Sequence, residues 1–173
     1  MGLGLLITNG LQETHFSAQT CKFPSSTRAE LMAVLVAILV TPLGSECKIL
    51  TDSANVISIL LNQTTTLHRW NKKANPHIIQ AILEIVQRKQ LHIKYTKVAA
   101  HTGNRGNEIA DKLAKIKEPF NPCGIRIIEV NPENFYQIAW TFTWNNKHIN
   151  QPINKFTKQM NKAKWHAKWR TQN

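Results

Sequence analysis

Cysteine and long apolar segments are both scarce in this chain. Its three cysteines, Cys21, Cys47 and Cys123, are widely spaced and never arranged as C-x-x-C. That pattern argues against a disulfide framework and a structural zinc site, and it fits a reducing compartment. The longest apolar run covers residues 31–40, about half of the length that crosses a bilayer. A membrane-spanning or disulfide-stapled protein is therefore not expected.

Targeting signals are also missing from the first residues. Residues 1–7 are apolar, but they carry no basic segment and are short for a signal peptide. Leu6 stands where the myristoylation pattern requires Ser or Thr. We therefore expect a soluble intracellular protein, either cytoplasmic or nuclear.

Acidic residues are the third scarcity. Only 10 Asp and Glu residues stand against 22 Lys and Arg residues, which gives a formal net charge of +12. An excess of this size favours polyanionic partners such as nucleic acid, although a basic protein without such a partner is the alternative. The 42% hydrophobic content and the length of 173 residues suit one globular domain with an appendage.

The order of the apolar patterns predicts an α/β fold. Two strands are expected within residues 2–23, joined at Asn9-Gly10, a dipeptide that suits tight hairpin turns. A densely apolar helix follows, with Ser25 or Ser26 as its N-cap. The later elements are a strand over 47–52, a helix capped by Ser53 that runs to about Leu61, a helix over 76–90 and a strand over 91–99. A last helix over 106–117 would have Ile109, Leu113 and Ile116 as its core stripe. We expect a mixed sheet covered by helices, in a first domain that ends near Lys117.

The few carboxylates fall at the ends of these elements. Asp52 and Asp111 are the only two aspartates. Asp52 ends a strand, Asp111 lies early in a helix, and Glu30 is at the start of the first helix. Three carboxylates can converge if a hard divalent cation neutralises them, and Mg²⁺ prefers such oxygen ligands. The alternative is that Glu30 and Asp111 only complement the positive ends of helix dipoles.

Three motifs resemble those of the type 1 ribonuclease H family. STRAEL (26–31) is similar to its helix-borne glutamate motif, and LTDSANVISIL (50–60) to its strand-to-helix aspartate motif. AHTGNRGNEIADKLA (100–114) resembles its histidine-loop signature, with Ala100 in place of a common glycine. The resemblance covers residues 2–117. It is closer to domains carried by retroelement reverse transcriptases, because the stretch between Leu61 and Pro76 is short.

The resemblance implies hydrolysis of the RNA strand of an RNA/DNA hybrid with two Mg²⁺ or Mn²⁺ ions. It makes Glu30, Asp52 and Asp111 catalytic metal ligands. His101 is expected to be catalytic too, moving a proton or helping product to leave from a loop that Gly103 and Gly106 loosen. Asn107 and Glu108 would fix that loop to the helix. The expected nucleic-acid contacts within the same motifs are Ser53, Asn55 and Arg105.

One part of the family pattern has no counterpart. The family carries an aspartate on its first strand, ahead of the hairpin that begins here at Gly2, and only Met1 precedes that position. The sole acid before Glu30 is Glu13. We therefore expect a ribonuclease H-like fold without its first strand and with impaired activity, within a larger reverse transcriptase polyprotein. The alternative is a non-catalytic protein that binds hybrid or RNA. An integrase- or resolvase-like nuclease is disfavoured by the histidine loop.

Residues 118–173 fall outside the resemblance. RIIEV (126–130) and YQIAWTFTW (136–144) are expected to be strands, and seven Lys or Arg residues but no acid follow Asn134. A final helix would present an apolar face opposite a face bearing Lys155, Lys158, Lys162, Trp165 and Trp169. Such interleaving suits phosphate contact with base stacking. The alternative is that the tryptophans pack against a neighbouring domain.

Overall fold

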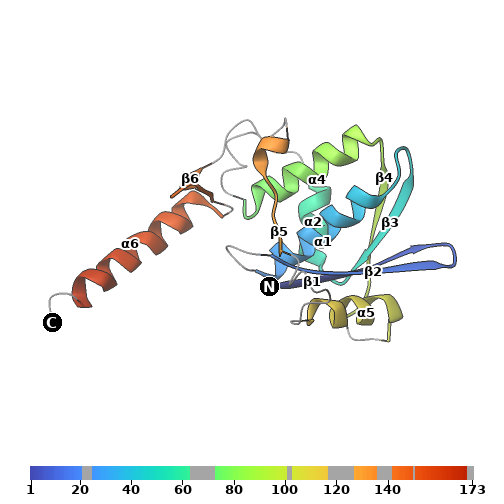
Figure 1. Ribbon diagram of the computed structural model, residues 1–173, viewed down its shortest axis with the longest axis horizontal. Coiled ribbons are helices and arrows are strands. Elements are labelled where there is room, and N and C mark those ends of the chain that lie inside the picture. The colour runs from blue at the N-terminus through green and yellow to red at the C-terminus, as the bar shows by residue number, and fades with distance from the viewer. Residues whose placement is uncertain are drawn as a thin grey trace.

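The computed structural model describes residues 1–20, 25–62, 73–100, 103–116, 127–135, 142–149 and 151–170. The helices are α1 (Ser26–Val40), α2 (Ala54–Leu61), α4 (Pro76–Arg88), α5 (Arg105–Ala114) and α6 (Ile153–Arg170), with a short 3₁₀ turn η1 (Pro132–Asn134). The strands are β1 (Gly2–Asn9), β2 (Gln12–Thr20), β3 (Glu46–Thr51), β4 (His92–Lys97), β5 (Ile127–Ile128), β6 (Thr143–Trp144) and β7 (Lys147–His148). The predicted α/β class is confirmed. Figure 1 shows α1, α2 and α4 on one side of the β1–β2 hairpin and α5 on the other.

The hairpin forms where the sequence predicted it. β1 and β2 pair antiparallel, with Asn9 opposite Gln12, so Gly10 and Leu11 make the turn. Gly10 has φ +61°, and Leu11 has no positive φ. A positive φ at only the first central residue matches a type II′ turn, which twists with the strands and needs glycine there. The turn is therefore shifted by one residue from the expected Asn9-Gly10 pair.

Two helices form the centre of the core. Ser25 caps α1, its hydroxyl accepting a hydrogen bond from the Arg28 backbone N–H at 3.1 Å. α4 packs against α1. The side chains of Ile78, Ile79 and Ile82 of α4 and of Leu31 of α1 are completely buried. Each such side chain stabilises the fold by about 1.5–3 kcal/mol relative to exposure. The helical spacing predicted for residues 76–90 is confirmed.

The strands are divided between separate sheets. β1, β2 and β5 form one sheet in that order, and β3 pairs in parallel with β4 in another, from Glu46–His92 to Thr51–Lys97. Among the described residues no strand is hydrogen-bonded to both β1 and β3.

The helix α5 packs closely on the outer face of β1. A Cβ added to Gly4 would stand 2.2 Å from the Ala110 carbonyl oxygen, so only glycine allows this approach. Ser17 of β2 adds a hydrogen bond from its hydroxyl to the Leu113 carbonyl oxygen, at 2.8 Å. The expected core stripe of α5 is only half-buried, and no α5 residue is fully buried. The expectation was too strong because α5 covers a single hairpin and is otherwise open to solvent.

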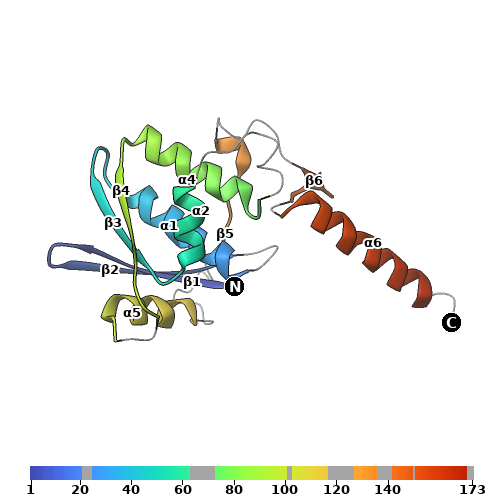
Figure 2. The same cartoon turned by 180° about the vertical axis from the view of Figure 1, so that it is seen from behind.

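The chain after residue 126 joins the body and then leaves it. β5 pairs in parallel with the end of β2, and Val130 belongs to the main core. The β6–β7 hairpin packs on α6, with the Trp144 and Phe156 rings 6.0 Å apart. Beyond this contact α6 extends away from the body, as Figure 2 shows from behind.

Of the expected strand over 136–144, residues 136–141 lie outside the described part. No described helix is both long and apolar enough to cross a membrane.

Candidate active site and an adjoining pocket

Asp52 is placed by the end of a strand and the start of a helix. It directly follows β3 and is half-buried. Ser53, the next residue, caps α2 by accepting a hydrogen bond from the Val56 N–H at 3.3 Å, and its own N–H donates to the Thr51 hydroxyl at 3.2 Å. Ser53 therefore has a structural role that fixes the backbone around Asp52. The sequence predicted this strand, cap and helix in that order.

The first turn of α5 reaches the same point. The Asn107 side-chain amide donates a hydrogen bond to an Asp52 carboxylate oxygen at 3.4 Å. Asp111, also half-buried, lies four residues after Asn107 and therefore on the same face of α5. This contact brings the second and third motifs together across 55 positions of sequence.

The capping of α5 differs from the expectation. Asn104 caps the helix by accepting a hydrogen bond from the Asn107 backbone N–H at 3.1 Å. Glu108 is exposed on the first turn. The anchoring role expected of Asn107 and Glu108 thus belongs to Asn104, which leaves the Asn107 side chain available to Asp52. An N-cap signal was present in the sequence, since Asn is a preferred capping residue.

Glu30 is the third predicted carboxylate, and it lies half-buried on α1. Near it, the Asn55 amide of α2 donates to the Thr27 hydroxyl of α1 at 3.2 Å, which ties the first and second motifs. Within the described residues, which include all three carboxylates, no group of three or more His, Cys, Asp or Glu side chains could hold a metal ion. Like charges on three elements repel one another when no cation lies between them. The oxygen donors suit Mg²⁺, but their joint role as ligands stays a prediction.

Arg105 is engaged with an acid of the hairpin. Its guanidinium donates to both carboxylate oxygens of Glu13, one of the bonds being 2.9 Å long. The Arg105 hydrogen bond lowers the pKa of Glu13, and the same contact raises the pKa of Arg105. Glu13 also lies 3.8 Å from the His15 ring nitrogen. A nucleic-acid contact by Arg105 therefore stays a prediction, and phosphate would have to compete with Glu13.

Three predicted residues fall where side chains are not described. His101 lies outside the described residues, between Ala100 and Gly103. Trp165 and Trp169 lie within α6, but the described side chains of that helix end at Lys164. Lys155, Lys158 and Lys162 are described, and all three are exposed. The catalytic and nucleic-acid roles of these residues stay predictions.

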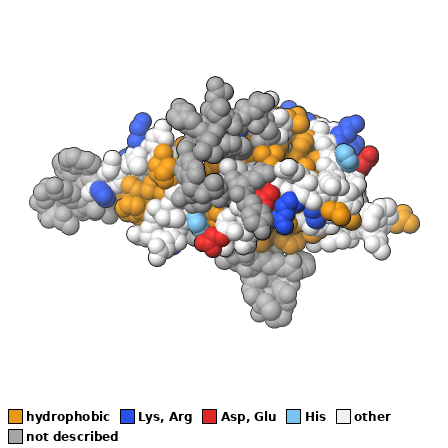
Figure 3. All heavy atoms as spheres, turned by 90° about the horizontal axis from the view of Figure 1, so that it is seen from above, with side chains coloured by type: hydrophobic (Ala, Val, Ile, Leu, Met, Phe, Trp, Pro, Cys, Tyr) orange, Lys and Arg blue, Asp and Glu red, His pale blue; other side chains and the backbone are white. Residues whose placement is uncertain are grey.

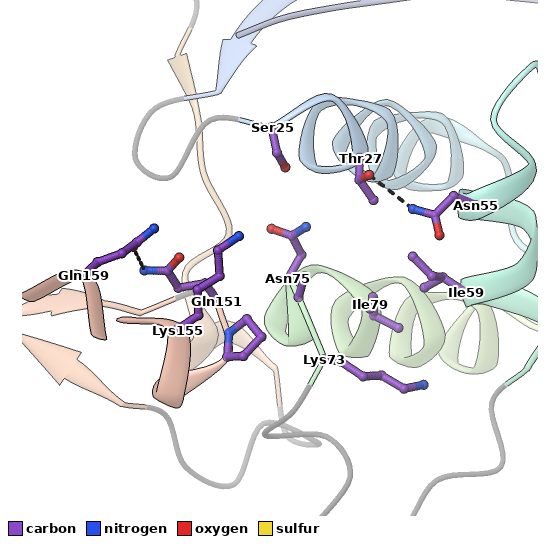
Figure 4. A pocket seen from close by; sticks show the side chains of 12 residues that line it. Ser25, Thr27, Asn55, Ile59, Lys73, Asn75, Ile79, Gln151, Lys155 and Gln159 are labelled. Carbon is purple, nitrogen blue, oxygen red and sulfur yellow. Dashed lines mark hydrogen bonds between the residues drawn. The ribbon is translucent and has the colours of Figure 1, made fainter. Parts of the chain in front are cut away.

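A pocket of about 640 Å³ opens beside the first and second motifs. Figure 4 shows Ser25, the N-cap of α1, and Thr27 of α1 facing Asn75 at the start of α4 across the pocket. Asn55 of α2 lies at one end. Lys155 of α6 closes the other end. Sequence reasoning missed this pocket, because its walls come from four separate segments.

Asn75 is the most constrained residue of the pocket. It is the N-cap of α4, only 4% exposed, with a left-handed backbone at φ 57°. Its side chain makes no capping hydrogen bond to α4, and it points into the pocket toward Ser25. A buried amide normally has a hydrogen-bond partner. Asn75 is therefore the polar side chain through which the start of α4 faces this pocket.

Comparison with known proteins gives a consistent match. Residues 1–118 match the family described as RNase H. A protein named Ribonuclease H from Trichodesmium erythraeum (strain IMS101) is 27% identical over 121 residues, which cover 65% of this chain and 75% of that protein. The match includes all three motifs and stops before η1, the β6–β7 hairpin and α6.

Proposed function

Because the chain belongs to the ribonuclease H family, we propose that it binds RNA/DNA hybrids and hydrolyses their RNA strand. The contact that carries the proposal is the hydrogen bond between Asn107 and Asp52. It places the helix of the third motif against the aspartate of the second, as one joint site requires. The net charge of +12 supports binding of a polyanion.

The chemistry assigned to the site follows from its oxygen donors. Glu30, Asp52 and Asp111 are the proposed ligands of divalent ions, which when bound supply a nucleophilic water and stabilise the leaving 3′-oxygen. Asn107 restrains the Asp52 carboxylate through its amide. His101, which precedes α5 in the sequence, is proposed to move a proton or to aid product release without binding metal.

The activity of this 173-residue chain is proposed to be low. A first-strand aspartate like that of the family has no equivalent before Glu30, where Glu13 is the only acid and is held by Arg105. Three carboxylates leave a paired-ion site incomplete. The second candidate function is therefore hybrid or RNA binding without catalysis.

A cleavage assay with matched substrates tests the proposal. The chain is incubated with an end-labelled RNA/DNA hybrid, an RNA duplex and a DNA duplex, with Mg²⁺ or Mn²⁺, and products are resolved by length. We expect slow cleavage of the hybrid's RNA strand alone, lost with chelator and in Asp52→Asn. Glu46→Gln, which removes an exposed acid from β3, is the matched control and should retain activity.

The two candidate functions give different outcomes. Hybrid binding with no cleavage at high enzyme concentration would establish the non-catalytic function. Cleavage that survives Asp52→Asn would contradict the assigned site. Calorimetric titration with Mn²⁺ gives a readout besides activity: weak binding should disappear in Asp52→Asn and persist in Glu46→Gln.

The domain is further proposed to be part of a retroelement reverse transcriptase polypeptide. The short connection between α2 and α4, over residues 62–75, is the feature that supports it. An antibody against residues 142–170 should detect a polypeptide larger than 19.7 kDa in expressing cells. Detection at 19.7 kDa alone would contradict this context.

A further inference from the structure

The helix α6 begins 35 residues after the family match ends at residue 118. Its 18 residues include six Lys or Arg and no Asp or Glu. We propose that the outer face of α6 is a second nucleic-acid-binding surface, separate from the candidate active site, which contacts the phosphate backbone whatever the sequence or the sugar. The inference rests on the proposed function for the class of partner, a nucleic acid.

One face of α6 packs on the β6–β7 hairpin. Phe156 is buried, and its ring lies 6.0 Å from that of Trp144 on β6. The Lys164 amine lies 5.9 Å from the centre of the same Trp144 ring. Met160, midway between Phe156 and Lys164 in the sequence, is half-buried. Residues four apart lie on one side of a helix, so these three positions mark the attached face of α6.

The hairpin in turn is attached to the body of the protein. His148 of β7 presents its ring edge-on to that of His77 at the start of α4, with the ring centres 6.1 Å apart. His77 and the residue after β7, Ile149, are each only 4% exposed. Because α6 is held on the hairpin and the hairpin on α4, the outer face of α6 keeps a defined direction.

That outer face carries three lysines. A helix turns by about 100° per residue, which places Lys158 and Lys162 about 160° round the axis from Met160. Lys155, Lys158 and Lys162 are all exposed. Lys155 and Lys162 are separated by about 10 Å along the helix axis, a length over which one strand of a duplex presents about three phosphates.

No acid neutralises these amines from within the helix. The last acidic residue of the chain is Glu133, which precedes α6 by 20 residues. Lys158 and Lys162 stand four residues apart, where like charges repel each other. The left end of the described surface in Figure 3, where α6 projects from the body, shows basic and apolar side chains and no acidic one. A polyanion bound along this face would remove the repulsion and release its own counterions.

The attached face decides between two anionic partners. A basic helix that binds an anionic membrane buries an apolar face in the lipid. In α6 the apolar positions Phe156 and Met160 lie on the side of the hairpin, where Trp144 covers Phe156. Charge is what the outer face offers, and it complements a phosphate backbone. Nucleic acid is therefore the partner that this surface fits.

The test compares neighbouring lysines on the two faces of α6. Fluorescence anisotropy of the full chain is measured in chelator, across a salt series, with an RNA/DNA hybrid, a DNA duplex and an RNA duplex of equal length. Lys162→Gln should weaken binding to all three by about threefold to tenfold and reduce the salt slope by about one. Lys164→Gln removes the same charge beside Trp144 and should leave the slope unchanged.

A double variant enlarges the effect and a conservative one controls it. Lys158→Gln with Lys162→Gln should reduce the slope by about two, whereas replacement of both by arginine keeps the charge and should retain the wild-type slope. Lys155 is left unchanged because it also lines the pocket. Circular dichroism checks that each variant is folded.

Three results would overturn the inference. Equal slopes for Lys162→Gln and Lys164→Gln would remove the distinction between the two faces. A loss of affinity for the hybrid alone, with both other duplexes unaffected, would show that these lysines serve a hybrid-specific site. Co-sedimentation of the chain with phosphatidylserine vesicles, lost in the double glutamine variant while its nucleic-acid affinity is unchanged, would assign the surface to a membrane.

The outcomes also separate this inference from the proposed function. Absent cleavage of the hybrid, together with the expected slopes, would refute the catalytic proposal and leave the role of α6 intact. Cleavage that depends on Asp52, together with equal slopes for the two single variants, would refute the role of α6 alone. Because the salt series contains no divalent ion, the affinities do not depend on catalysis.

Discussion

Replacing Gly4 by alanine should push α5 away from β1. An ideal Cβ at this position would lie 2.2 Å from the Ala110 carbonyl oxygen, 2.6 Å from the Ala114 nitrogen and 2.6 Å from the Leu113 Cβ. Two of these three atoms belong to the backbone, so no side-chain rotation can relieve the clash. Because ordinary carbon contacts begin near 3.5 Å, the helix must shift by about 1 Å.

The expected cost follows from that shift. Overpacked sites of this kind lose about 1–3 kcal/mol, and a clash with rigid backbone belongs at the upper end. We therefore expect Gly4→Ala to reduce the free energy of unfolding by about 3 kcal/mol, which lowers Tm by roughly 6–12 °C for a chain of this size. The shift also moves Asn107 and Asp111, so hybrid cleavage should fall by more than the loss of folded protein explains.

Thermal unfolding followed by circular dichroism measures the effect. Gly44→Ala is the control, because Gly44 has φ +68° and nothing within 4 Å of its Cβ position. It carries only backbone strain, about 1–2 kcal/mol. If Gly4→Ala were no less stable than Gly44→Ala, the close contact between α5 and β1 would be refuted.

Three further predictions concern the sheet, the C-terminal helix and a buried histidine. Adding a strand of family type with D-G-S ahead of Gly2 should raise both Tm and the rate of Mg²⁺-dependent cleavage. Replacing the aspartate of that added strand by asparagine should abolish cleavage but keep the higher Tm. An addition that changes neither Tm nor cleavage would refute this interpretation of the sheet. Deleting residues 152–173 should weaken hybrid binding and flatten its salt dependence, as anisotropy measures, whereas an unchanged slope would favour a packing role for the tryptophans. Burial, together with His148 and Arg28, lowers the pKa of His77 from 6.5 to about 4 in the folded protein. As the pH falls, the unfolded chain therefore binds a proton at this histidine before the folded chain does. The free energy of unfolding should then fall by at most about 3 kcal/mol between pH 6.5 and pH 4. Urea unfolding of His77→Leu should lack this part of the fall, and identical pH profiles would contradict it.

Most elements were predictable because their signals are local. Ser25 and Ser53 cap the helices that their positions indicated, and the isoleucines of α4 are buried at the predicted spacing. The spacing of apolar residues and the capping of helices depend only on residues a few positions apart in the sequence. The family motifs added the identity of the candidate site.

The remaining features depend on packing between distant segments. No local pattern in the sequence indicates the left-handed backbone of Asn75. The pocket closed by Lys155 and the Arg105–Glu13 ion pair each depend on contact between segments that are distant in sequence. The same limit applies to the carboxylates. The motifs identify Glu30, Asp52 and Asp111, but how closely these carboxylates approach one another depends on the packing of α1, β3 and α5 and on charge repulsion.

The attachment of α5 to the hairpin also sets an order of assembly. The β1–β2 hairpin pairs neighbours in sequence, whereas the Ser17–Leu113 bond closes a separation of 96 residues. Contacts of such separation form late, since loop-closure entropy opposes them until the rest of the chain is folded. During synthesis the hairpin emerges before α5, so its outer face stays uncovered until α5 has been made. We therefore expect the Asp52–Asn107 contact to be among the last to form, after the hydrophobic core that supports it.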